Sequence, residues 1–181
     1  MKKVPLGEYD DNYSLKILRI VFAVRVLRRW LKKMSELNNN KPLFWPIDWD
    51  DLTEAQRFFQ NVPFFGIKAF VKRFLDKRMK CRTKEILYLW PDIQQVIYTR
   101  DIIIRFLIDY SFWEYPLFHP DDPCNIVFWK PDENLEIAEI LTRISHQFSL
   151  PIHFFDDFNH KTLLQLVEDI ASGANIHPGP K

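Results

Sequence analysis

Apolar residues recur every three or four positions in several long stretches of this chain, which is the spacing of an amphipathic α-helix. These stretches end where asparagine, proline or glycine interrupts the pattern, as at residues 38–42 and at Gly173. Strand-like alternation is scarce, and residues 125–129 are the one candidate for a short extended piece. The pattern predicts an all-α fold with helices over residues 14–37, 51–60, 66–79, 92–109, 134–148 and 162–172, and a capped turn over 83–90.

Start signals mark the last two of these helices. Asp132 or Asn134 is expected to cap the first of them, because side-chain oxygens there accept hydrogen bonds from free backbone N–H groups. The run Thr162-Leu163-Leu164-Gln165 is a capping-box pattern, in which the first and fourth residues each bond the other's backbone N–H. We therefore expect the last helix to begin at Thr162.

The helix over residues 92–109 is apolar around most of its circumference. Its polar positions form a single stripe, made of Gln94, Tyr98, Asp101, Arg105 and Asp109. A helix with so much apolar surface is predicted to be buried on several sides. Residues 110–131, rich in proline and aromatic residues, are too long for an ordinary connection, and their aromatic side chains predict a loop held down by packing.

Composition excludes several classes of protein. Four glycines cannot assemble a glycine-rich phosphate loop, and two cysteines cannot form a disulfide framework or a four-thiolate zinc site. Neither cysteine lies near a histidine in a recognisable catalytic signature, so we expect no enzyme and no cofactor. Neither a secretory leader nor a membrane-spanning run of about 18 apolar residues is apparent, and a cytoplasmic location is the expectation.

Charge divides the chain unevenly although the net charge is only +1. Residues 1–41 hold ten basic and four acidic residues, and residues 66–84 hold eight basic residues and one acidic residue. Residues 85–181 hold six basic and fifteen acidic residues. Such a division suggests surfaces with different partners, or two halves that dock on each other. We expect a basic helical region over residues 1–90, an acidic helical bundle over 91–175 and a tail over 176–181.

The C-terminal half resembles the acyl carrier proteins over about residues 92–171. Three segments carry the resemblance: Asn134-Leu135-Glu136-Ile137-Ala138-Glu139-Ile140, Phe148-Ser149-Leu150-Pro151-Ile152, and the nine residues from Thr162 to Ile170. The corresponding carrier segments read Asp-Ser-Leu-Asp-x-x-Glu-Leu, a Phe-Gly-Ile-x-Ile turn, and Thr-Val-x-x-Leu-Val-x-x-Ile. The resemblance implies a carrier-like helical bundle, to which the N-terminal half adds a helical extension.

The same resemblance places the carrier serine at Asn134. In carriers that serine accepts the phosphopantetheine arm, and the reaction needs a hydroxyl oxygen that an asparagine side chain lacks. The next hydroxyl along the helix, Ser145, is eleven residues away, roughly 16 Å at about 1.5 Å per residue. We therefore expect a carrier-like protein that cannot carry phosphopantetheine.

An acidic helix remains when the carrier serine is absent. In carriers the corresponding helix is a docking surface for basic patches on partner enzymes. Here that surface would consist of Glu133, Asn134, Glu136 and Glu139. The sequence thus predicts recognition of a protein with a basic patch, although the basic N-terminal half is a second, intramolecular candidate for this surface.

The alternative function is peripheral attachment to an anionic membrane through the helix over residues 14–37. Its basic positions are Arg19, Arg25, Arg28, Arg29, Lys32 and Lys33, and Phe22 and Trp30 are candidate aromatic anchors. The apolar stripe equally predicts packing inside a bundle, with long basic side chains reaching water. Nucleic acid is not an expected partner, because the acidic half would repel phosphates.

Two clusters hold side chains that are able to bind metals. His153, Asp157 and His160 would share one face of a helix, and imidazole and carboxylate groups bind divalent metals. The phenylalanines between them favour a segment wrapped onto the core, so no metal site is predicted. The second cluster, His119, Asp121, Asp122 and Cys124, is interrupted by prolines and is predicted to form a turn.

Overall fold

The computed structural model describes residues 40–47, 49, 53–54, 57, 65–110, 113–129 and 135–173. The chain divides into two compact units, Met1–Leu37 and Asn38–Lys181, and every described residue belongs to the second. The expected helix over 14–37, most of the one over 51–60 and the tail over 176–181 lie outside the described residues. Described residues on both sides of position 90 belong to this second unit.

The described elements are all helical, which confirms an all-α fold for this part of the chain. They are α3 (Phe65–Lys80), η1 (Lys84–Leu89), α4 (Gln94–Tyr110), α5 (Cys124–Val127), α6 (Leu135–Phe148), η2 (Ile152–Phe155), η3 (Phe158–His160) and α7 (Leu163–Gly173). Among these residues the sole β-type pairing is an isolated bridge between Pro123 and Thr162. None of the helices in the described part is both long and apolar enough to cross a bilayer.

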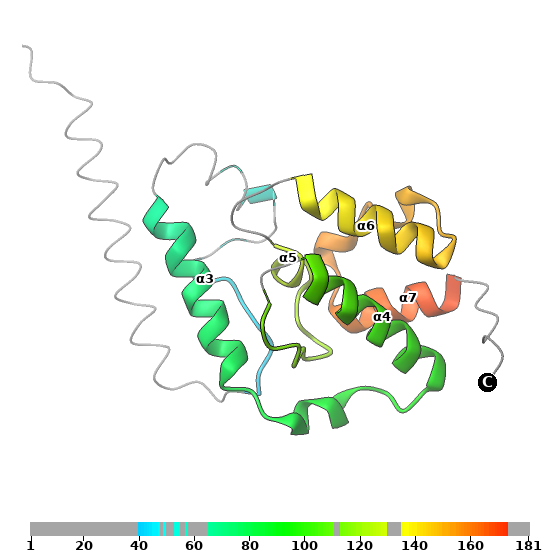
Figure 1. Ribbon diagram of the computed structural model, residues 1–181, viewed down its shortest axis with the longest axis horizontal. Coiled ribbons are helices and arrows are strands. Elements are labelled where there is room, and N and C mark those ends of the chain that lie inside the picture. Colours follow the sequence, from blue (N-terminus) through cyan, green and yellow to red (C-terminus); the bar gives the residue numbers. More distant parts are fainter. Residues whose placement is uncertain are drawn as a thin grey trace, which may run out of the picture. The chain divides into compact units, whose positions relative to one another are not determined.

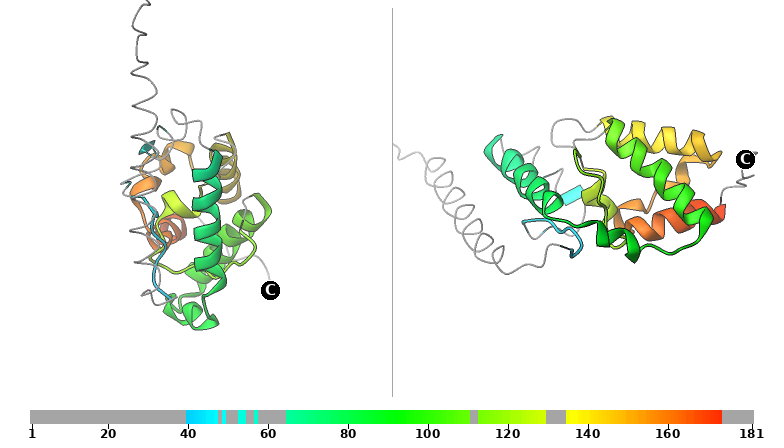
Figure 2. Two further views of the ribbon diagram at one scale, coloured as in Figure 1. Left: turned by 90° about the vertical axis from the view of Figure 1, so that its left-hand side faces the viewer. Right: turned by 60° about the horizontal axis from the view of Figure 1, so that its bottom comes forward.

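Three helices form the bundle of the C-terminal half. Helix α4 packs against both α6 and α7. The chain runs along α6 and α7 in the same direction and along α4 in the opposite direction, and η2 and η3 connect the end of α6 to the start of α7 (Figure 1; Figure 2). The bundle core consists of buried aliphatic side chains, among them Ile103, Leu107, Ile140, Ile144, Leu166 and Ile170. Burial of these side chains is the main source of the stability of such a bundle.

Helix α4 corrects one expectation. It was predicted to be buried on several sides, but only Val96, Thr99, Ile103 and Leu107 are buried, at spacings of three and four. Ile108 on the same helix is 44% exposed, and Ile93, just before it, is 55% exposed. Helices α6 and α7 cover one side of α4, so apolar residues on its other sides retain contact with water in the structure.

The loop before α6 is held down by its aromatic residues, as expected. The Trp113 indole N–H donates to the carbonyl of Val127 at 2.8 Å, and the Trp90 indole N–H donates to the carbonyl of Phe118 at 3.0 Å. Phe118 itself is fully buried, with its ring edge-on to Trp113. The candidate extended piece at 125–129 was wrong, because residues 124–127 form the helical turn α5.

The connection between α6 and α7 begins with a residue in the left-handed conformation and ends with a capping box. Ser149, just after α6, has a φ of 54°, a left-handed conformation in which the Leu150 N–H reaches back to the Ser145 carbonyl at 2.9 Å. At the start of α7, Thr162 N–H donates to Gln165 Oε1 at 2.9 Å, and Gln165 N–H donates to Thr162 Oγ1 at 3.2 Å. This confirms the predicted capping box.

Candidate interaction surface

The residues of the predicted acidic surface lie at and just before the start of α6. Helix α6 begins at Leu135, one residue after Asn134. Glu133 and Asn134 lie outside the described residues, and Glu136 is described only as part of the helix backbone. Glu139 is therefore the member of the set whose side chain the structure places.

Glu139 is exposed but carries an ion pair on its own helix. The Arg143 Nη2 lies 2.6 Å from Glu139 Oε1, and Arg143 Nε lies 3.2 Å from the same oxygen. The Arg143 guanidinium also lies 4.4 Å from the centre of the Tyr110 ring at the end of α4. The hydrogen bond that Arg143 donates to Glu139 raises the pKa of Arg143. The exposed side of the middle of α6 is thus of mixed charge rather than acidic.

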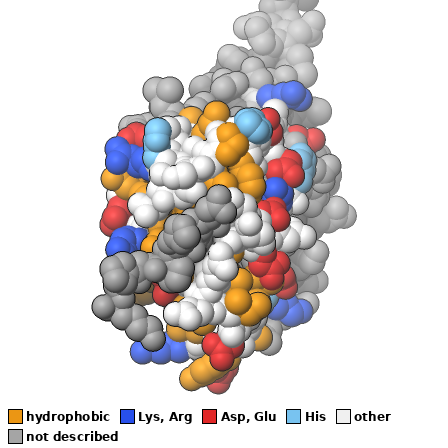
Figure 3. Space-filling model, turned by 90° about the vertical axis from the view of Figure 1, so that its right-hand side faces the viewer, with side chains coloured by type: hydrophobic (Ala, Val, Ile, Leu, Met, Phe, Trp, Pro, Cys, Tyr) orange, Lys and Arg blue, Asp and Glu red, His pale blue; other side chains and the backbone are white. Residues whose placement is uncertain are grey.

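The rest of α6 divides as its periodicity predicts. Ile137, Ile140, Leu141, Ile144 and Phe148 are buried, which confirms the inner face. The outer face, hereafter the α6 surface, consists of Ala138, Glu139, Thr142, Arg143, His146 and Gln147, which are all exposed. Around the C-terminal ends of α6 and α7, the described hydrophobic, acidic, basic and histidine side chains are interspersed (Figure 3).

The first metal-binding candidate does not form a site. Among the described residues, no three histidine, cysteine or acidic side chains are placed to hold one metal ion, so His153, Asp157 and His160 do not converge. Asp157 instead pairs with Lys161 at 2.7 Å, and Lys161 also pairs with Asp169 at 2.9 Å. The hydrogen bond from Lys161 lowers the pKa of Asp157. These residues tie η3 to α7.

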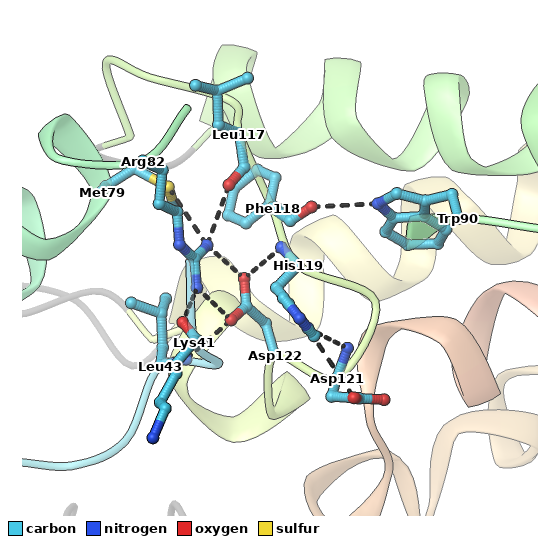
Figure 4. Close-up of polar contacts among 10 residues, drawn as sticks. All are labelled: Lys41, Leu43, Met79, Arg82, Trp90, Leu117, Phe118, His119, Asp121 and Asp122. Atoms are coloured by element: carbon cyan, nitrogen blue, oxygen red, sulfur yellow. Dashed lines mark hydrogen bonds and ion pairs between the residues drawn. The ribbon is translucent and has the colours of Figure 1, made fainter. Parts of the chain in front are cut away.

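The second cluster forms the turn that was predicted, and it also contains a buried ion pair (Figure 4). Asp122 and Arg82 have fully buried side chains, and their oxygens and nitrogens meet at 2.5 Å and 2.6 Å. The Asp122 carboxylate also accepts hydrogen bonds from the backbone N–H groups of Leu43 and His119, both at 2.8 Å. Four donors therefore satisfy this carboxylate, as a buried charge requires.

Arg82 extends the same network to two further carbonyls. Its Nη1 donates to the carbonyl of Leu117 at 2.9 Å, and its Nη2 donates to the carbonyl of Lys41 at 3.1 Å. The backbone of the same turn caps α7, because Leu163 N–H donates to the Asp122 carbonyl and Leu164 N–H to the Pro120 carbonyl, both at 2.8 Å. We call the Arg82–Asp122 pair and these bonds the buried clamp. It joins residues 41–43, the end of α3, the 117–122 turn and α7.

Two other side chains of this cluster, His119 and Cys124, are uncharged and unreactive. Burial lowers the pKa of His119, and its Nδ1 accepts a hydrogen bond from the Asp121 backbone N–H at 2.9 Å, so the ring is neutral. Cys124 is completely buried, and burial raises the pKa of its thiol, which keeps it protonated and unreactive. The cluster therefore holds the fold together and offers no nucleophile.

The alternative membrane surface, Arg19, Arg25, Arg28, Arg29, Lys32 and Lys33, lies entirely outside the described residues. Comparison of the chain with protein-family models, with curated proteins and with solved structures found no significant match.

Proposed function

We propose that this chain is a carrier-like helical protein that does not carry phosphopantetheine and acts by binding another protein through the α6 surface and the acidic residues that precede it. The observation that carries the proposal is the position of Asn134. It directly precedes α6, the helix that runs opposite to α4 and is linked to α7 by short helical turns. This is the order of helices that the resemblance to carriers implies.

The turn after α6 gives further support. The resemblance aligns Ser149 with a glycine of the carrier turn, and Ser149 has the left-handed backbone, φ 54°, that favours glycine. The left-handed backbone at Ser149, where the resemblance aligns a glycine, supports a turn of similar geometry in this chain and in the carriers.

The side chain at position 134 argues against carrier chemistry. Attachment of the arm requires an oxygen nucleophile, and an asparagine amide cannot attack a phosphoanhydride. Ser145 is no substitute, because it is buried and its hydroxyl donates to the Leu150 carbonyl. Of the functions of a carrier, docking to a partner protein is the one that does not need the serine.

The charges on α6 define the partner's chemistry. Acidic residues around the start of a helix are stabilised by its dipole and are available to a basic patch. Further along, Glu139 and Arg143 present one charge of each sign, with Tyr110 beside them. The proposed partner therefore has a basic patch facing the start of α6 and a carboxylate or carbonyl group that accepts from Arg143.

An affinity pull-down with the full chain from its native host tests the proposal. We expect a partner to be retained by the natural protein and lost with Glu139→Lys, because the reversal removes the acidic charge and the pairing with Arg143. Glu168→Lys, the same change at an exposed position on α7, is the matched control and should retain the partner. Retention of the same proteins by Glu139→Lys and by the natural chain would contradict a role for the α6 surface.

A further inference from the structure

Helix α3 ends with a buried arginine that the interactions described so far do not use. Arg78 is only 7% exposed, and it lies in the last turn of α3. Its guanidinium carbon is 5.5 Å from the centre of the Phe44 ring, which itself packs edge-on against Phe74 at 5.5 Å. Phe44 thus covers two residues of α3 that are one helical turn apart.

The guanidinium of Arg78 lacks the hydrogen bonds that a buried charge needs. Its Nε and Nη2 atoms are buried and have no hydrogen-bond partner in the described part of the chain. Arg82, one turn further on, contrasts with it, because both Nη atoms of Arg82 have oxygen partners. Burial without compensation, together with the nearby charge of Arg82, lowers the pKa of Arg78.

The one neighbouring carboxylate in the described structure is not available to Arg78. Asp122 contributes to the electrostatics of Arg78 but already accepts from both Nη atoms of Arg82 and from two backbone N–H groups. A carboxylate has about four acceptor positions, and here all are used. Among the described residues, Arg78 therefore has no carboxylate to which its buried Nε and Nη2 atoms donate.

The group missing at this place is an acceptor. An arginine side chain has only donors, so it cannot be satisfied by another donor. A planar guanidinium matches the oxygen atoms of a carboxylate or a phosphate group. We propose that Arg78 binds an oxyanion, a phosphate or carboxylate group of a ligand, between the end of α3 and the segment containing Phe44.

Access to the site depends on Phe44. Its side chain is only partly buried and lies against the guanidinium, whereas Arg78 is 7% exposed, and in this proposal the ring moves aside to admit the ligand. Exposed basic residues on the same helix, including Arg73, Lys77 and Lys80, raise the local concentration of anions. The site is separate from the α6 surface, and its test does not depend on the proposed docking function.

Thermal unfolding of the full chain in inorganic phosphate tests this proposal. At a phosphate concentration about 20 times the dissociation constant, Tm should rise by about 4 °C relative to sodium chloride of equal ionic strength. Arg78→Met, which removes charge and donors with little change in volume, should abolish the rise. Arg73→Met removes the same charge from an exposed position of α3 and should retain it.

Two additions make the result decisive. Sodium acetate in place of phosphate identifies the kind of ligand. If Tm rises only in phosphate, the site selects a phosphate group; if Tm rises in both salts, it binds oxyanions in general. If Arg78→Met does not fold, the Arg78→Lys variant is used in its place. Arg78→Lys should weaken phosphate binding at least tenfold in isothermal titration, because lysine lacks the planar set of guanidinium N–H donors. A natural chain that responds to neither anion beyond sodium chloride, or equal responses in the natural and Arg78 variants, overturns the proposal.

Discussion

The most strongly constrained side chain in the described structure is Asp122, whose carboxylate accepts four hydrogen bonds in a fully buried position. The sequence indicated its role in a turn, because Asp122 lies between two prolines. It did not indicate the partner. Arg82 is forty residues earlier in a run of basic residues, and nothing in that run distinguishes the buried arginine from the solvated ones. Pairing over this distance depends on the tertiary structure.

Replacement of Asp122 by asparagine should destabilise the protein by about 3–5 kcal/mol, because it leaves the buried charge of Arg82 without a counter-ion. Urea unfolding measures this loss. Asp121→Asn is the matched control, since its side chain is exposed and lies 3.9 Å from the neutral ring of His119. The control should change the free energy of unfolding by no more than about 0.5 kcal/mol. Similar values for the two variants would show that the buried clamp does not hold the turn.

At the scale of elements, the sequence predicted what depends on local rules. The capping box of Thr162 and Gln165 at the start of α7 and the inner face of α6 follow from capping rules and from periodicity, and both are confirmed. Burial of α4 was predicted wrongly, because the number of neighbouring helices decides how many apolar positions are covered. The turn α5 was missed because four residues are too few for a period to be recognised.

The turn after α6 gives a prediction at this scale. Ser149→Gly should stabilise the protein by about 1 kcal/mol, because a residue with a Cβ is strained at a φ of 54° and glycine is not. Thr142→Gly, which introduces glycine at an exposed position inside α6, should instead destabilise the protein by about 0.5 kcal/mol. Thermal unfolding measures both. Destabilisation by Ser149→Gly would contradict the left-handed turn and the local support it gives to the resemblance.

At the scale of the whole molecule, hydrophobic periodicity correctly predicted an all-α fold for the described part, and the compact unit that contains this part includes segments of different charge. The buried clamp joins residues 41–43 and 82 of the basic half to residues 117–122 of the acidic half, within one compact unit. Net charge reflects the partners and solubility of a segment, whereas the extent of a unit is set by which apolar surfaces are buried together.

The central proposal is that this chain resembles a carrier in the order of its helices and lacks the residue that accepts the arm. Its most direct test is the intact mass of the purified full chain after incubation with coenzyme A and a phosphopantetheinyl transferase, with an authentic carrier as the positive control. We predict that the mass of the natural chain stays unchanged while the control is fully converted. A gain equal to the mass of the phosphopantetheine arm would contradict the account, since another hydroxyl would then have to serve in place of position 134.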